Sequence, residues 1–323
     1  MQIQQKLGSG FDATTTAAQA VGNLDLRGRL FVVTGGHAGL GREAVRALAA
    51  AGASVWVGAR DPERAAQALA GIDGVRTAPL DLSDPTSVDA FAARILAEGQ
   101  PLHALINNAG IMAVPLQRDV NGHELQLSTN HLGHFRLTAR LWPALVAAQG
   151  ARVVALSSGA HRFGGVDLED PDYRARPYDK WQAYGQSKTA AALFALELDR
   201  RGAAHGVRAF SVHPGAIKTG LGEHLTQADY IEIGIFTPDG EPRPEFAKLF
   251  KTMEQGAATT VWCATSPRLV GLGGLYCEDC DVADLIPATS QSLLGVLPHA
   301  VDPDVARAWW TVSEALADVR FPI

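Results

Sequence analysis

The sequence predicts one α/β domain with a doubly wound, mostly parallel sheet of seven strands and helices on both faces. Short apolar runs rich in β-branched residues alternate along the chain with longer Ala- and Leu-rich segments of helical period. The apolar runs are unbroken, as is typical of parallel strands that are covered on both faces. Right-handed crossovers leave few ways to connect such elements, which favours a doubly wound sheet.

The elements follow one another in a regular order. The seven predicted strands are residues 30–34, 54–59, 75–79, 104–107, 152–157, 207–213 and 274–277. The predicted helices are residues 42–51, 122–148, 178–201, 254–264 and 303–317. Asp84 followed by Pro85 marks one more helix, because Asp caps a helix start and Pro suits the first turn.

Three segments surround or interrupt this core. Residues 1–29 are predicted to form an irregular N-terminal arm, residues 30–284 the catalytic domain, and residues 285–323 a C-terminal extension packed on the same domain. Residues 217–250 contain several Gly and Pro residues and are predicted to lack regular structure. A long loop in a compact enzyme is typically a lid or a binding loop, so we expect this segment to cover the substrate.

Composition excludes several classes of function. A net charge of -6 and a pI near 5.9 argue against a general nucleic-acid binder. No stretch of about 18 apolar residues is present, so no membrane span is expected. Cys263, Cys277 and Cys280 are too few for a disulfide framework. We therefore expect a cytoplasmic protein without a metal site, with Cys277 and Cys280 at a strand end and turn.

A Gly-rich turn follows the first predicted strand. Residues 34–41 read Thr-Gly-Gly-His-Ala-Gly-Leu-Gly, and a predicted helix begins directly after them. Such glycines allow a tight turn and bring helix N–H groups against a pyrophosphate. Tight turns also use Gly for purely structural reasons, but the strand before and the helix after favour dinucleotide binding.

Further motifs occur in a recognisable order. Residues 107–110 read Asn-Asn-Ala-Gly, and Tyr184 and Lys188 are spaced as Tyr-x-x-x-Lys. Asn130 and Ser158 lie between these two motifs, and Pro214-Gly215 follows the second. Together with the Gly-rich turn, these motifs resemble the short-chain dehydrogenase/reductase family. Residues 130–135, 157–163 and 274–280 resemble its retinol-dehydrogenase-like and WW-domain-oxidoreductase-like branch, including bacterial members. The resemblance implies a Rossmann domain, and a homodimer or homotetramer formed through the helices that carry Asn130 and Tyr184.

The resemblance also implies which residues bind a nicotinamide cofactor. They come from the Gly-rich turn, the ends of later strands and the catalytic helix. They are Gly35, His37, Gly39, Leu40, Gly41, Arg60, Asp81, Leu82, Asn108, Ala109, Gly110, Tyr184, Lys188, Pro214, Gly215, Ile217 and Thr219. Asp81 has a competing interpretation as a helix cap.

The end of the second strand indicates the cofactor. An acidic residue there binds the ribose of NAD, whereas Arg accommodates the 2′-phosphate of NADP. This chain has Ala59 in the acidic position and Arg60 next, so NADP is favoured. Two alternatives stay open: Arg60 is a surface charge paired with Asp61 or Glu63, or Asp61 itself serves NAD. Because Ala38 stands where many NADP-preferring relatives have a basic residue, NAD remains possible.

The predicted catalytic residues are Asn130, Ser158, Tyr184 and Lys188. Tyr184 and Lys188 are four residues apart, so they share one face of a helix. The ammonium of Lys188 and a positive nicotinamide are expected to lower the pKa of the phenol, which is ordinarily about 10. Ser158 is expected to hydrogen-bond the substrate oxygen, with Ser157 as the alternative serine. The resemblance implies that Asn130 holds a water that connects Lys188 to solvent.

These residues together predict an NADP(H)-dependent alcohol dehydrogenase or carbonyl reductase. The expected substrate is a small apolar secondary alcohol or ketone, or an alcohol and aldehyde pair. One alternative is an NAD-dependent dehydrogenase that works in the oxidative direction. Another is a non-catalytic member that binds or senses the nucleotide.

Overall fold

The computed structural model describes residues 4–217, 220–247, 250–290 and 292–323. Its main sheet has eight strands in the order β10-β9-β6-β5-β4-β1-β2-β3. The strands are β1 (Leu30–Thr34), β2 (Ser54–Ala59), β3 (Val75–Pro79), β4 (Leu102–Asn107), β5 (Ala151–Leu156), β6 (Val207–Val212), β9 (Leu275–Glu278) and β10 (Asp281–Val282). The seven predicted strands are confirmed and run parallel; β10 was not predicted, because two antiparallel residues carry no sequence period.

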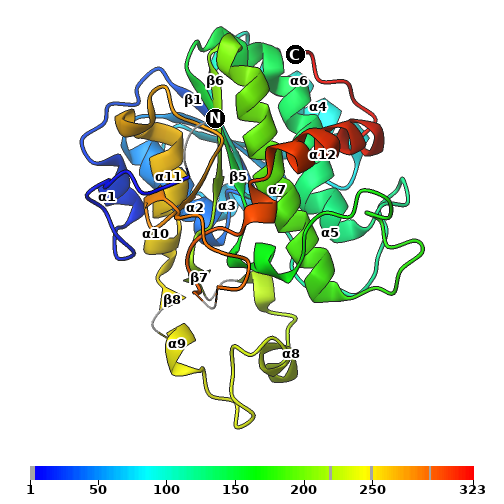
Figure 1. Cartoon of the computed structure of the whole chain (residues 1–323). Helices are drawn as coiled ribbons and strands as arrows, with labels where there is room; N and C mark the ends of the chain where they lie inside the picture. The colour runs from blue at the N-terminus through cyan, green and yellow to red at the C-terminus, as the bar shows by residue number, and fades with distance from the viewer. Residues whose placement is uncertain (1–3, 218–219, 248–249, 291) are drawn as a thin grey trace.

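Helices cover both faces of the sheet (Figure 1). They are α1 (Ala17–Val21), α2 (Gly39–Ala50), α3 (Pro62–Ala68), α4 (Pro85–Leu96), α5 (Leu125–Leu127), α6 (Gly133–Ala147), α7 (Lys180–Gly202), α8 (Gln227–Glu232), α9 (Pro244–Ala247), α10 (Met253–Gly256), α11 (Ala258–Thr265) and α12 (Pro303–Leu316). Helices α4, α6, α7 and α12 pack on one face, and α1, α2 and α11 on the other. No helix in the described part of the chain is long and apolar enough to span a membrane.

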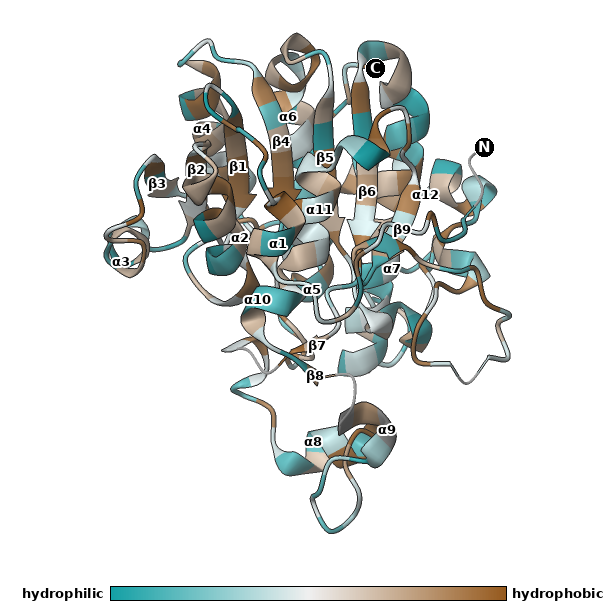
Figure 2. Ribbon diagram, turned by 90° about the vertical axis from the view of Figure 1, so that its left-hand side faces the viewer, coloured by the Kyte–Doolittle hydropathy of each residue, from teal (hydrophilic) through white to brown (hydrophobic). Residues whose placement is uncertain are grey.

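The central strand β1 shows how the two faces are built. Its residues are all buried, and they alternate between two apolar cores. Leu30 and Val32 belong to the core beneath α4, α6 and α7, whereas Phe31 and Val33 belong to the core beneath α2 and α11. This period of two follows from the pleat of a strand. Figure 2 shows the strongly hydrophobic central strands enclosed between helices.

The order of the strands reverses next to β1. The chain proceeds from β1 to β2 and β3 in one direction, and from β4 to β5 and β6 in the other. Ligands in doubly wound sheets bind beyond the carboxyl ends of the strands at such a reversal. Thr34 and Asn107 end the two strands concerned, so the fold places the Gly-rich turn beside the Asn-Asn-Ala-Gly motif.

The predicted helix over residues 122–148 is interrupted. It consists of α5, a π-helical turn, η1 (Ser128–Leu132), and α6. Turns of this kind occur mostly inside α-helices and frequently at functional sites. Asn130 lies in the middle of the π-helical turn, which sequence period alone does not reveal.

The arm and the lid contain more regular structure than predicted. Thr16 and Gln19 form a capping box at the start of α1, whose Ala and Val side chains pack in the core. The Asp281 carboxylate in β10 accepts N–H bonds from Leu7, Gly8 and Ser9 and so fixes the arm. In the lid, α8, α9 and the small parallel pair β7 (Ala216–Ile217) and β8 (Phe250–Lys251) replace the expected irregular loop. These short elements depend on caps and tertiary contacts, which short windows of sequence do not show.

The turn after β9 also matches its prediction. Asp279 and Cys280 both adopt a left-handed backbone conformation and connect β9 to β10. All three cysteines are free and buried. Cys277 and Cys280 therefore lie at a strand end and turn, as the sequence indicated.

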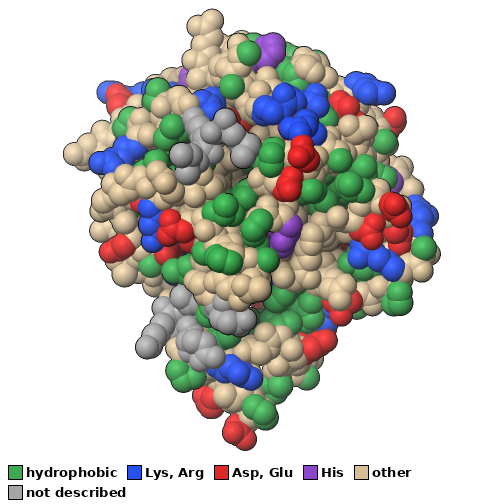
Figure 3. Space-filling view, in the orientation of Figure 1, with side chains coloured by type: hydrophobic (Ala, Val, Ile, Leu, Met, Phe, Trp, Pro, Cys, Tyr) green, Lys and Arg blue, Asp and Glu red, His purple; other side chains and the backbone are tan. Residues whose placement is uncertain are grey.

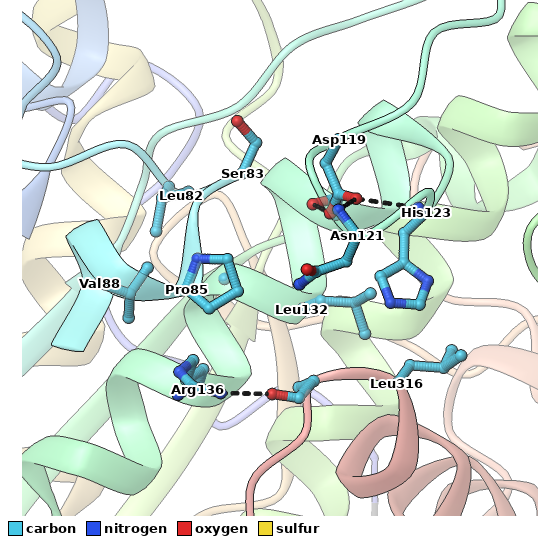
Figure 4. Close-up of a pocket in the computed structure, with 13 residues that line it drawn as sticks. Leu82, Ser83, Pro85, Val88, Asp119, Asn121, His123, Leu132, Arg136 and Leu316 are labelled. Carbon is cyan, nitrogen blue, oxygen red and sulfur yellow. Dashed lines mark hydrogen bonds between the residues drawn. The ribbon is translucent and has the colours of Figure 1, made fainter.

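The C-terminal extension packs on the helices that carry the motifs. Trp309 and Trp310 of α12 are buried, and the Trp310 ring stacks 6.0 Å from Phe194 of α7. Arg136 of α6 donates to the carbonyls of Ala317 and Asp318 at 2.8 and 2.9 Å, directly after the end of α12. Figure 4 shows one hydrogen bond from Arg136 to this segment. The extension thus belongs to the same apolar core as the sheet.

Replacing Arg136 should destabilise the fold more than replacing its neighbour Arg140. Both guanidinium groups bind Asp89, but Arg136 is 11% exposed and also bonds two carbonyls, whereas Arg140 is 42% exposed. We expect Arg136→Met to lower the free energy of unfolding by about 1–3 kcal/mol. Arg140→Met should cost about 1 kcal/mol or less, because exposed pairs contribute little. Urea denaturation measures both, and equal losses would contradict the anchoring role of Arg136.

Candidate active site

One large cavity opens where the sheet reverses. It has a volume of about 1500 Å³ and is lined by the carboxyl ends of the strands, the start of α7 and the lid. Every predicted site residue lines it except Asn130 and Thr219. Asn130 is buried behind the wall, and Thr219 lies outside the described residues. A second pocket, between α4, η1 and the end of α12, has only about 20 Å³, room for a water molecule (Figure 4).

The Gly-rich turn fits closely against the segment that follows β4. The Thr34 hydroxyl accepts the N–H groups of Asn108 and Ala109, each at 2.9 Å. The Asn108 side-chain amide donates to the Thr34 carbonyl at 2.8 Å. A Cβ atom at Gly41 would lie 2.5 Å from the Gly35 carbonyl oxygen and 2.6 Å from the Asn108 amide nitrogen. Only glycine fits at position 41, so the backbone stays open to a phosphate at the start of α2.

The end of β2 offers positive charge to the cavity. Arg60 lines the cavity and makes no ion pair with any residue that the structure describes. Asp61 caps α3, where its carboxylate accepts the N–H of Arg64 at 2.9 Å. Nearby, the buried Nδ1 of His37 has no hydrogen-bond partner in the described structure. Among the described residues Arg60 thus has neither Asp61 nor Glu63 as an ion-pair partner, and Asp61 caps α3 and does not line the cavity. The choice between NADP and NAD stays a prediction.

Asp81 is not the cap of the following helix. Asp84 caps α4 by accepting the N–H of Thr86 at 2.8 Å. One carboxylate oxygen of Asp81 accepts the N–H and the hydroxyl of Ser83 at 2.9 and 2.6 Å. Asp81 also lines the cavity. The competing interpretation of Asp81 as a helix cap is wrong, and its second carboxylate oxygen is available to a ligand.

Three predicted catalytic residues meet on the cavity floor. Tyr184 and Lys188 lie on one face of α7, with the Lys188 ammonium nitrogen 5.6 Å from the Tyr184 ring centroid. The ammonium donates to the Leu156 carbonyl at 3.0 Å. Ser158 caps the turn after β5, where its hydroxyl accepts the N–H of Ala160 at 3.1 Å, and it lines the cavity together with Tyr184. The Ser157 hydroxyl instead donates to the Lys188 carbonyl at 2.8 Å, so Ser158 is the serine directed to the phenol.

Burial is the main cause of the pKa shifts of Tyr184 and Lys188. It raises the pKa of Tyr184 to about 12, and hydrogen bonding to Ser158 opposes the rise. Burial also lowers the pKa of Lys188 to about 8. Burial therefore opposes the lowering of the Tyr184 pKa that was expected from Lys188 and a positive nicotinamide, and that lowering stays a prediction. The ammonium bonds a backbone carbonyl rather than the phenol, and desolvation outweighs its field.

Asn130 supports the cavity wall from behind. Its side chain accepts the Ile111 N–H and donates to the Ile111 carbonyl, both at 2.9 Å, and it also donates to the Ser187 hydroxyl. A Cβ atom at Gly110 would lie 2.9 Å from the Asn130 amide oxygen and 3.6 Å from the Lys188 ammonium nitrogen. Asn130, Gly110 and Lys188 are thus in close proximity, but the Asn130 side chain is fully engaged.

The lid forms the outer, largely apolar half of the cavity. Ion pairs hold it at both ends: Lys180 of α7 with Asp229 of α8, and Lys251 of β8 with Asp279. Figure 3 shows hydrophobic side chains gathered between the body of the molecule and the lid at the bottom of the view.

Several cavity residues were missed by the sequence analysis. They come from the arm, the catalytic helix, the lid and the C-terminal extension, and include Thr14, Met112, Trp181, Lys251, Asp279 and Leu294. Trp181 had a usable signal, because it precedes Tyr184 by three residues on the same helix and therefore shares its face. The others reach the cavity through long-range folding and carried no local signal.

Comparison with known proteins places the chain in a family. The model of the short chain dehydrogenase family matches residues 29–229. A Streptomyces lividans protein named "Probable oxidoreductase" is 46% identical over 293 residues, covering 89% of this chain and 97% of the relative. Human Retinol dehydrogenase 12 is 36% identical over 305 residues, covering 93% of this chain and 89% of the relative.

A solved structure agrees over the same extent. The crystal structure of an uncharacterized protein from Mycobacterium Paratuberculosis has a TM-score of 0.73 and 34% identity, covering 94% of this chain and 98% of that one. The family match spans the Gly-rich turn, the Asn-Asn-Ala-Gly motif and the Tyr184 and Lys188 pair. The chain is an oxidoreductase that belongs to the short-chain dehydrogenase/reductase family.

Proposed function

We propose that this protein is an NADP(H)-dependent enzyme that interconverts an apolar secondary alcohol and its ketone, or an alcohol and its aldehyde. The observation that carries the proposal is the meeting of Ser158, Tyr184 and Lys188 on the floor of one cavity. The same cavity continues to the Gly-rich turn and to Arg60. A hydroxyl pair and a buried ammonium beside a dinucleotide site suit reduction of a carbonyl group.

The residues around the turn fit an NADP molecule. Gly41 leaves the backbone open to the pyrophosphate, and Arg60 and the unpartnered His37 nitrogen offer groups to a 2′-phosphate. Asp81, Asn108 and the remaining predicted residues line the adenosine side and the path to Tyr184. When bound, the nicotinamide supplies a hydride to the carbonyl carbon or accepts one from the carbinol carbon.

The catalytic residues handle the substrate oxygen. Ser158 donates a hydrogen bond to the carbonyl oxygen and fixes its position against Tyr184. The Tyr184 phenol gives its proton to that oxygen as negative charge develops. Burial raises the pKa of Tyr184 to about 12, so the phenol carries its proton at neutral pH and can donate it. The positive charge of Lys188 stabilises the phenolate that results and binds the ribose hydroxyls.

The lid suggests the substrate class. Tyr230, Ile233, Phe236, Phe246 and Leu294 line the cavity beyond the catalytic residues. The rings of Tyr230 and Phe236 stack with their centroids 5.1 Å apart, forming a flat apolar wall. Apolar walls with a few polar groups at one end favour a hydrophobic molecule that presents a single oxygen.

We propose that any homodimer or homotetramer uses a surface other than the one expected from the sequence. Most residues of helix α7 are buried within one chain. Trp309 and Trp310 of α12 pack in the same apolar core as residues of α6 and α7. A partner could contact the outer face of α7 only by displacing α12. Association through this helix pair would expose a large apolar core to water.

Replacing Tyr184 by Phe should abolish turnover without loss of cofactor binding. The change removes only the hydroxyl that transfers the proton, a role that contributes about 10²- to 10⁴-fold to the rate. NADPH oxidation with a panel of apolar ketones and aldehydes measures turnover, and fluorescence titration measures NADPH binding. Tyr178→Phe is the matched control, since Tyr178 is half-buried nearby but does not line the cavity. Full activity in Tyr184→Phe would refute the assignment.

The rate of carbonyl reduction should fall as the pH rises above about 8. The charge of Lys188 is present below its pKa of about 8 and is lost above it. Loss of this charge removes the stabilisation of the Tyr184 phenolate, so kcat should be level below this pH and decline above it. The measurement is the pH profile of kcat at saturating NADPH. A rate that stays level well into the alkaline range would contradict the role of Lys188.

Replacing Arg60 by Ala should weaken NADPH binding about ten- to a hundredfold, because one charged hydrogen-bond donor to the 2′-phosphate is lost. NADH binding should be unchanged, since NADH has a hydroxyl in place of that phosphate. The control is Arg46→Ala, which removes an Arg that pairs with Glu43 and does not line the cavity. An unchanged NADPH affinity in Arg60→Ala would show that Arg60 does not select the cofactor.

A further inference from the structure

A buried histidine connects the Gly-rich turn to the turn that carries Asn130. His134 follows the π-helical turn at the start of α6 and is 3% exposed. Its Nδ1 lies 3.0 Å from the Asn130 carbonyl oxygen, and its Nε2 lies 2.8 Å from the Thr34 hydroxyl oxygen. One imidazole therefore joins β1 to the helix behind the catalytic residues.

Counting protons fixes the form of this imidazole. The Thr34 hydroxyl already accepts two backbone N–H groups, from Asn108 and Ala109. Its single proton is left for His134, so Nε2 accepts that proton and must be unprotonated. The Asn130 carbonyl is only an acceptor, so Nδ1 carries the proton. His134 is thus a neutral imidazole with its hydrogen on Nδ1, and burial agrees by lowering its pKa to about 4.

His134 binds the backbone carbonyl of Asn130 and not its side chain. The Asn130 side chain is already occupied by both backbone groups of Ile111 and by the Ser187 hydroxyl. Its backbone carbonyl is a further polar group, and it accepts the hydrogen bond from the His134 ring.

We propose that His134 is a positioning residue, which fixes the turn around Asn130, beside Ser187 and Lys188, by tying the Asn130 carbonyl to the Gly-rich turn through Thr34. The proposal rests on the proposed function, because its kinetic consequence requires turnover. Through this link the Thr34 turn, the Asn108-Ala109 segment and the Asn130 turn move as one body. His134 does not line the cavity, so it acts only through these neighbours.

The same helical segment offers a matched control. His131 is equally buried, and burial lowers its pKa to about 3. Its Nε2 interacts with the Ser313 hydroxyl at 2.7 Å and with the Trp309 indole at 3.1 Å, both in α12. His131 therefore supports the C-terminal helix and has no contact with the turn at Thr34.

The kinetic test compares two replacements of His134. Phe keeps the ring shape and loses both hydrogen bonds, whereas Gln keeps a donor for the Asn130 carbonyl. We expect His134→Phe to lower kcat on the order of ten- to a hundredfold with little change in the KM of the carbonyl substrate. His134→Gln should recover most of kcat, and His131→Phe should keep it. If Phe is tolerated better than Gln, or if both histidine-to-Phe variants lose kcat equally, His134 serves packing alone and the proposal fails.

A second readout does not depend on activity. In protein labelled with ¹⁵N-histidine, the long-range proton–nitrogen spectrum shows which ring nitrogen carries hydrogen. We expect His134, assigned by its absence from His134→Gln, to keep hydrogen on Nδ1 and to show no titration across the neutral range. Hydrogen on Nε2, or a titration near neutral pH, would overturn the link to Asn130. Absence of any turnover in the unaltered protein would instead refute the proposed function, and the spectrum would still decide the link.

Discussion

The Thr34 hydroxyl holds together the two loops on which the whole site depends. It lies at the end of β1, where the strand order reverses, and accepts the N–H groups of Asn108 and Ala109 from the loop after β4. Because the two loops approach so closely, a Cβ atom at position 41 would collide with the Gly35 carbonyl and the Asn108 amide. This contact fixes the Gly-rich turn against the inner wall of the cavity. The Gly-rich turn and the Asn-Asn-Ala-Gly segment are therefore joined directly beneath the cavity.

Much of this arrangement was predictable from the sequence, because it rests on local patterns. Unbroken apolar runs identified all seven parallel strands, and the alternation with helical segments identified the doubly wound sheet. Motifs at strand ends must converge at one edge of a parallel sheet, so Gly35, Asn108 and Ser158 lie in a common cavity. The spacing of Tyr184 and Lys188 placed both on one helix face.

The remainder depends on contacts between distant segments. The π-helical turn around Asn130 and the cover that α12 provides for α7 arise only in the folded chain. Burial is also a property of the fold. It raises the pKa of Tyr184, although the nearby Lys188 suggested the opposite from sequence. The link through His134 joins Thr34, Asn130 and His134, which are up to 100 positions apart in the sequence. No sequence spacing predicts such a contact.

The most direct test of hydride transfer at this site follows the hydride itself. NADPH carrying deuterium at both C4 positions of the nicotinamide would be incubated with the protein and a panel of apolar ketones and aldehydes, and the products analysed by mass spectrometry. The proposed function predicts one deuterium on the carbinol carbon and a proton from solvent on the oxygen. Tight NADPH binding without deuterium transfer to any member of a broad panel would contradict it and would favour a protein that only binds the nucleotide.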